Sequence, residues 1–385
     1  MNQTEQVLLQ AIQKSLWNKN ITFREDTDWN AVLKEAEDQA ILGIAASAAP
    51  EAYQIEWKKK ASHITAHFVR ILHYQEQLYG ILRDNGIPMV ILKGTAAAVY
   101  YPNPSLRSMG DIDYLVPLDA FDRAKELLIA NGYTVDDDQR TPRHMHVYKD
   151  GIPFEQHRFF SSEGVEVEKY ITEGLSEITT GSIYGTEFPM LPMLANGLVL
   201  LGHLVQHLKN GLGLRQVIDW MMYVNRELND AFWKQAFQKA ADETGLKQTA
   251  IVVTRMCQMY MGLSDEILWC KDADPKLCTE LMENLLSSGN FGRKRGSGSA
   301  VESVTSNIAR KGLFRYLQTA GEYNWKAYHK HHCLKPFAWL YQIGRYAKKG
   351  FQAKRSGAQL KEDIERGKQR KELLKKLKID NRIDT

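Results

Sequence analysis

Gly110-Asp111-Ile112-Asp113-Tyr114-Leu115-Val116 is the stretch of this chain that decides its fold. Two carboxylates stand one residue apart in a run that otherwise has the apolar character of a buried strand. Residues i and i+2 of a strand point to the same face, so Asp111 and Asp113 project together. Two like charges held this close repel each other, and a divalent cation is the usual counter-charge. The alternative is a solvated strand end that carries two aspartates.

The composition is that of a soluble chain with a large core. The 385 residues are 44% hydrophobic, which is enough for two or three folded units. The mean hydropathy is −0.40 and no long uncharged apolar run occurs, so we expect no transmembrane segment. Residues 1–19 lack the apolar centre of a signal peptide. The four cysteines are widely spaced and fit neither a zinc motif nor a disulfide framework, which favours a reduced, cytoplasmic setting.

The charge is distributed unevenly along the chain. The net charge is +4, but residues 345–378 contain thirteen Lys/Arg and four Asp/Glu, a local net charge of +9. Within them, residues 361–377 have the pattern of a charged helix with an apolar stripe at Ile364, Leu373, Leu374 and Leu377. We interpret this tail as a solvated surface helix. Contact with nucleic acid or another anionic surface is possible but not favoured.

The order of elements predicts an α+β fold, mostly helical, with a small mixed sheet between two helical regions. Residues 4–86 have helical periodicity; short apolar strands are expected at 87–92 and 111–116, with a helix over 96–100 between them. Asp119 is expected to cap a further helix that ends near residue 131. Residues 290–300 read as a loop. The remaining helices are predicted at 195–209, 215–227, 230–244, 247–261, 275–286, 304–319 and 325–348.

Four regions follow from this order. They are an N-terminal helical region (1–84), an α/β core (85–193), a C-terminal helical domain (194–350) and a basic helical tail (351–385).

A β-hairpin is predicted around Asp150-Gly151, a strong two-residue turn signal. With a two-residue loop, His146 faces Glu155 and His144 faces His157 across the pair of strands. All four side chains then lie on one face of the sheet. These histidines and Glu155 could hold a metal of their own, or they could simply be the polar lining of an open sheet face.

A phosphate-binding turn is one interpretation of Lys93-Gly94-Thr95. Glycine lets the backbone approach a ligand closely, a helix starting at Ala96 would present free amides, and Thr95 adds a hydroxyl. An ordinary strand-to-helix turn is the alternative.

Several of these segments together resemble a known family. Leu92-Lys93-Gly94-Thr95, Tyr101-Pro102, Arg107 and residues 110–116 are similar to the nucleotidyltransferase superfamily of DNA polymerase β type. Within it, the chain is most similar to a bacterial branch called uncharacterised nucleotidyltransferases, over about residues 60–225. Thr95 stands where serine is commoner, and the gap from Thr95 to Asp111 is longer than in minimal members.

The resemblance implies a reaction and a set of site residues. Members move a nucleoside monophosphate from an NTP, here expected to be ATP, to an acceptor and release pyrophosphate. Asp111 and Asp113 would hold two Mg²⁺ ions, with Mn²⁺ as a possible substitute. Glu155 is the best candidate for the third carboxylate and for the base, and Glu166 and Glu168, which lie in the next strand-like run, are weaker options.

The same resemblance implies phosphate contacts. The backbone near Gly94 and Thr95 would cradle phosphates, and Lys93 or Arg107 would balance their charge. Plain surface charge is the alternative for both cations. The acceptor, a hydroxyl or similar group on a small molecule or protein, is not indicated.

A second cluster comes from the later helices. His203 and His207 are four residues apart, as are Arg215 and Asp219, so each pair shares a helix face. A zinc site and a buried hydrogen-bond network are both open interpretations. The resemblance implies a role near the nucleotide for His207, Arg215 and Asp219.

Two other functions remain open. One is a catalytically inactive nucleotide-binding regulatory module. The other is an RNA-directed nucleotidyltransferase that uses the basic tail.

Overall fold

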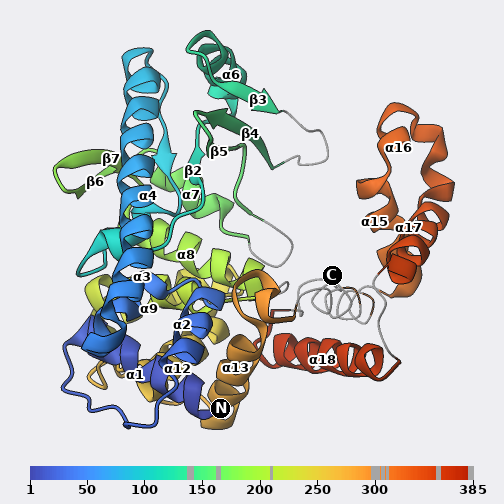
Figure 1. Ribbon diagram of the computed structural model, residues 1–385. Helices are drawn as coiled ribbons and strands as arrows, with labels where there is room; N and C mark the ends of the chain where they lie inside the picture. Colours follow the sequence, from blue (N-terminus) through green and yellow to red (C-terminus); the bar gives the residue numbers. More distant parts are fainter. Residues whose placement is uncertain are drawn as a thin grey trace.

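The computed structural model describes residues 1–136, 143–161, 166–208, 211–295, 304, 308, 312–352 and 357–379. A mixed β-sheet lies among helices from both ends of the chain (Figure 1). The α+β prediction, with a small mixed sheet between helical regions, is confirmed.

The strands lie in the spatial order β3-β4-β5-β2-β1-β7-β6. Their bounds are β1 Val90–Ile91, β2 Ile112–Leu115, β3 Thr134–Asp136, β4 His144–Lys149, β5 Ile152–His157, β6 Thr179–Ile183 and β7 Thr186–Met190. β2 is central: it pairs antiparallel with β1 and parallel with β5. The parallel register places Asp113 directly opposite Glu155, so the sheet itself brings the two carboxylates together.

The predicted hairpin is confirmed residue by residue. Lys149 pairs with Ile152 across Asp150-Gly151, His146 pairs with Glu155, and His144 pairs with His157. Asp150 and Gly151 both adopt positive φ, as this two-residue turn requires.

The helical bounds before and around the sheet are α1 Gln3–Trp17, α2 Trp29–Asp38, α3 Leu42–Ala45, α4 Glu51–Asp84, α5 Thr95–Ala98, α6 Phe121–Ala130 and α7 Glu168–Gly174. Those that follow are α8 Met193–Leu208, α9 Leu214–Glu227, α10 Asp230–Phe232, α11 Gln238–Glu243, α12 Lys247–Met261, α13 Pro275–Ser288, α15 Leu313–Asn324, α16 Lys326–Lys330, α17 Ala338–Gln352 and α18 Gly357–Lys376. The long helix α4 packs against β7 and α6, while α8 and α9 pack together as a hairpin.

Several local expectations were wrong. Asp119 caps no helix, because it lies in a 3₁₀ turn and α6 starts after Ala120 without a side-chain cap. Glu168 begins α7 rather than lying on a strand, and its carboxylate accepts the amides of Phe160 and Ser161. Glu166 also lies outside any strand.

Two predicted helices are interrupted. A π-helical turn at Trp233–Phe237 divides the helix expected over 230–244. A 3₁₀ segment, His332–Phe337, contains Pro336 and separates α16 from α17. Proline lacks the amide that a continuous helix needs, which accounts for the second break.

The C-terminal helices form two groups (Figure 1). α15 and α17 pack on each other, and α18 packs on α13. Of the helix expected over 304–319, residues 313–319 lie in α15 and residues 304 and 308 are helical, while residues 305–307 and 309–311 lie outside the described residues. Within the described part of the chain, no helix combines the length and apolarity needed to cross a membrane.

Candidate active site

Three carboxylates converge at one end of the central strands. Asp111 immediately precedes β2, Asp113 lies within it, and Glu155 lies on the parallel neighbour β5. One ligand oxygen from each lies within 4.8 Å of the others. Oxygen donors of this kind fit a hard divalent cation such as Mg²⁺ or Mn²⁺. Glu155, Glu166 and Glu168 were the candidates for the third carboxylate, and Glu155 is the one that the sheet brings to the two aspartates.

Asp113 is the buried centre of an ion-pair network. Its Oδ1 atom lies 2.6 Å from Nζ of Lys93 and 3.0 Å from Nε2 of His157. Burial alone would raise the pKa of this carboxyl, but Lys93 and the His157 hydrogen bond outweigh burial and hold the pKa well below its usual range. Asp113 is therefore a permanent anion at the base of the site.

The pKa of Asp111 is shifted in the opposite direction. The charge of Asp113, together with burial, raises the pKa of Asp111 to about 6. A cation between the two aspartates would relieve this repulsion, so the chemistry of the donor set favours metal binding.

These carboxylates line a small polar cavity of about 230 Å³. Its lining residues are Lys93, Gly94, Arg107, Gly110, Asp111, Asp113, Glu155, His203, His207 and Arg215. The cavity therefore combines anionic groups that can hold cations with cationic groups that can hold phosphate.

His203 and His207 are neighbours on this cavity wall, with their Nε2 atoms 2.8 Å apart. Burial, followed by the charges of Lys93 and Arg215, lowers the pKa of His207 to about 3. Burial and His207 hold the pKa of His203 well below its usual range. Both rings are therefore neutral near pH 7. Among the described residues, neither belongs to a group of three or more potential metal ligands.

Arg107 is buried rather than a surface charge. Its guanidinium makes two parallel bonds of 2.7 Å to the carboxylate of Asp219, which also accepts a hydrogen bond from the Tyr101 hydroxyl. Asp219 does not line the small cavity and instead holds Arg107 at the cavity wall. Lys93 is mostly covered as well, since its side chain is only 12% exposed.

Only part of the Lys93-Gly94-Thr95 turn is placed for the expected phosphate contacts. Gly94 has φ 56° and ψ −114°, a conformation that residues with a Cβ atom rarely adopt, and it lines the cavity. The Thr95 hydroxyl points away and donates to Oε1 of Gln75 on α4, at 2.6 Å. The amides of Ala96 and Ala97 donate to the carbonyls of Lys93 and Gly94, so the helix start does not present them as free donors.

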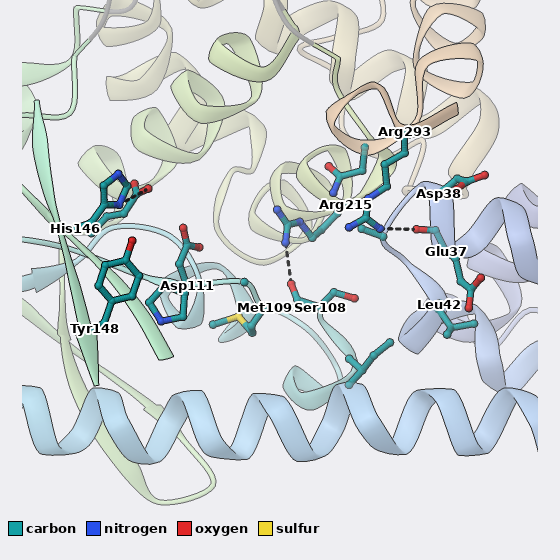
Figure 2. A pocket seen from close by; sticks show the side chains of 16 residues that line it. Glu37, Asp38, Leu42, Ser108, Met109, Asp111, His146, Tyr148, Arg215 and Arg293 are labelled. Atoms are coloured by element: carbon teal, nitrogen blue, oxygen red, sulfur yellow. Dashed lines mark hydrogen bonds and ion pairs between the residues drawn. The ribbon is translucent and has the colours of Figure 1, made fainter. Parts of the chain in front are cut away.

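Arg215 joins this cavity to a larger one of about 810 Å³. Its Nη1 donates to the Ser108 carbonyl at 3.1 Å, whereas its Nε atom is buried and makes no hydrogen bond. Figure 2 shows Asp111, His146 and Tyr148 on one side of the larger cavity, facing Arg215, Arg293 and Glu37 on the other.

Sequence reasoning missed most of the larger cavity. Glu37 comes from α2, and Arg293 comes from a 3₁₀ helix, Asn290–Arg295, in the stretch that was expected to be a loop. Residues 296–300 of that stretch lie outside the described residues. No local motif marks these residues, because only tertiary packing brings their elements to the sheet edge.

The sheet thus brings three carboxylates to a small cavity that cationic side chains also line. A family model described as uncharacterised nucleotidyltransferase matches residues 25–262, which is more than half of the chain. The protein therefore belongs to this nucleotidyltransferase family. Searches of curated proteins and of solved structures returned no match.

Proposed function

We propose that the protein transfers a nucleoside monophosphate from an NTP, most simply ATP, to a hydroxyl or similar group of a small-molecule or protein acceptor, releasing pyrophosphate. Its family supports nucleotidyl transfer from an NTP in general. The observation that carries the rest is the convergence of Asp111, Asp113 and Glu155 beside a cationic cavity. The motif order also supports membership of the DNA polymerase β-like superfamily.

The three carboxylates fit two divalent cations, which we propose to be Mg²⁺. When bound, such ions neutralise charge on the attacking and leaving oxygens. Glu155 is 22% exposed as a side chain, more than Asp113, and so is better placed to accept the acceptor's proton.

The cationic residues serve the triphosphate in this proposal. Lys93 pairs with Asp113 and lines the small cavity, where its ammonium could also contact phosphate. Arg215 has a buried, unbonded Nε and lies where the two cavities meet, which suits contact with phosphate. His207 and the Gly94 backbone complete the wall around it. The larger cavity is the proposed acceptor site.

We also propose a cytoplasmic setting for this reaction. All four cysteines are free thiols, and three of them are buried. A reducing compartment keeps such thiols from pairing.

Pyrophosphate release tests the proposal. Purified protein is incubated with Mg²⁺, each of the four common NTPs and pools of small-molecule or protein acceptors, and pyrophosphate is measured with an enzyme-coupled assay. We expect release with at least one NTP and its loss, by at least about a thousandfold, in Asp111→Asn.

An exposed aspartate provides the matched control. Asp265 lies in a turn after α12 and its side chain is 80% exposed. Asp265→Asn should therefore retain wild-type pyrophosphate release. If wild type and Asp111→Asn are equally inactive with every NTP and pool while ATP still raises the melting temperature, the protein is a nucleotide-binding module without turnover, and the proposal is wrong.

A further inference from the structure

Three histidines surround Glu155 on the face of the β4–β5 hairpin. Nε2 of His144 lies 3.7 Å from Oε1 of Glu155, and Nδ1 of His146 lies 3.8 Å from the same oxygen. Nε2 of His157 lies 3.5 Å from Oε2. The ring centroid of His144 is 5.0 Å from that of His146 and 5.2 Å from that of His157. These contacts form a compact cluster of nitrogen and oxygen ligands.

The spacing suits a bound transition-metal ion better than direct hydrogen bonds. Zinc-type ions hold nitrogen and oxygen ligands at about 2.0–2.2 Å in tetrahedral sites, which places neighbouring ligand atoms about 3.4 Å apart. The two distances to Oε1, 3.7 and 3.8 Å, and the one to Oε2, 3.5 Å, are close to that edge length. One ligand atom each from His144, Glu155 and His157 also lies within 4.8 Å of the other two.

Two buried atoms in the cluster lack partners. Nδ1 of His144 and Nδ1 of His157 are both buried and make no hydrogen bond. A ring that bound an ion through Nε2 would carry its proton on Nδ1, so these Nδ1 atoms are not the metal ligands and would need acceptors of their own.

The hairpin register holds the cluster in place. His144 is paired with His157, and His146 with Glu155, by backbone hydrogen bonds on either side. The ligands therefore need only side-chain rotations to close on an ion, which lowers the conformational cost of binding.

We infer that His144, His157 and Glu155, assisted by His146, form a binding site for a first-row divalent transition metal such as Zn²⁺ or Co²⁺. Imidazole nitrogens favour these ions over Mg²⁺, which prefers oxygen alone. The site adjoins the Asp111–Asp113 pair and shares Glu155 with it. On binding, His157 would exchange its 3.0 Å contact with Asp113 for the metal, leaving Asp113 paired with Lys93.

Cobalt binding tests this inference without any nucleotide. The full-length protein is stripped of metal with a chelator and titrated with Co²⁺, whose visible absorption reports nitrogen ligation. We expect about one equivalent to bind, and His144→Gln to weaken its affinity by at least about tenfold. Elemental analysis after Zn²⁺ loading provides a second measurement of stoichiometry.

Two variants separate this site from the carboxylate site. Asp111→Asn should keep the cobalt spectrum, because Asp111 contributes only to the oxygen-donor group. His73→Gln, on the exposed face of α4, is the matched histidine control and should bind Co²⁺ as wild type does. Circular dichroism confirms that each variant is folded.

The results that overturn the inference are specific. The first is Co²⁺ binding of equal affinity in wild type and in folded His144→Gln. The second is a wild-type spectrum without nitrogen-ligated Co²⁺. The third is a loss of Co²⁺ affinity in Asp111→Asn as large as that in His144→Gln. A protein that binds Co²⁺ as expected but releases no pyrophosphate would retain this site and refute only the proposed reaction.

Discussion

Asp111 and Asp113 are the same residue type two positions apart, yet they experience opposite electrostatic environments. Asp113 is held ionised by Lys93 and His157, whereas Asp111 carries a pKa raised to about 6, chiefly by the charge of Asp113. In the absence of metal, removing the charge of Asp111 should therefore stabilise the fold, whereas removing the charge of Asp113 should destabilise it.

We predict that Asp111→Asn raises the free energy of unfolding by about 1–3 kcal/mol at pH 7.5. A pKa raised above the unfolded value means that Asp111 favours the folded state while protonated. That contribution is complete below about pH 4 and is lost as pH rises through 6. The gain of the variant over wild type should thus be small at pH 4 and full above pH 7, measured by urea unfolding in chelator.

Asp113→Asn should behave in the opposite way. It leaves the buried Lys93 without its closest partner, so we expect a loss of about 3 kcal/mol in the same urea experiment. Equal effects of the two substitutions would contradict this account of the site's electrostatics.

Only some of these residues could be predicted from sequence. The shared face of Asp111 and Asp113 follows from period-two alternation, which is local. Glu155 was expected as the third carboxylate from the family resemblance, and it meets the aspartates only through the pairing of β2 with β5. The burial of Lys93 and the direction of the Thr95 hydroxyl depend on contacts with residues far along the chain, such as Gln75 of α4. No local pattern carries that information.

At the scale of elements, one ion pair connects the sheet region to the helical hairpin α8–α9. Arg107 precedes β2, whereas Asp219 lies on α9, and both side chains are almost fully buried. Their two 2.7 Å bonds hold Arg107 at the cavity wall.

We predict that Asp219→Ala lowers the free energy of unfolding by about 3–5 kcal/mol, because it leaves the Arg107 guanidinium buried without its carboxylate. Chemical denaturation followed by circular dichroism measures this loss. The double variant Arg107→Met with Asp219→Leu removes both charges and should recover most of it. Additive losses in the double variant would show that the two side chains do not act as a pair.

The elements themselves were predictable to different degrees. The β4–β5 register followed from Asp150-Gly151, because a two-residue turn fixes the pairing of the strands. The β6–β7 hairpin was missed: β6 contains Gly181 and threonines rather than a clear apolar alternation, and its turn is Tyr184-Gly185. β1 proved to be only two residues long: of the strand expected over 87–92 it lacks chiefly the first three residues, which include Pro88, a residue with no amide to donate to a ladder.

At the scale of the whole molecule, the basic tail is docked rather than free. Leu373, Leu374 and Leu377 of the predicted apolar stripe are buried where α18 meets α13, and Lys376 pairs with Glu280 of α13 at 2.6 Å. Ile364, nearer the start of α18, is 36% exposed. The stripe thus divides into a buried end and an exposed end on the same helix.

This division gives a matched pair of substitutions. We predict that Leu374→Ala lowers the free energy of unfolding by about 2–5 kcal/mol, because it removes buried methyl groups and leaves a cavity. Ile364→Ala shortens a side chain that is already partly in water, so its cost should stay below about 1 kcal/mol. Urea unfolding of both variants beside wild type measures the difference. If the two variants lose equally little, α18 does not pack on α13 in solution, and its basic residues are then available to an anionic partner. A large loss in Leu374→Ala alone establishes the tail as part of the helical body.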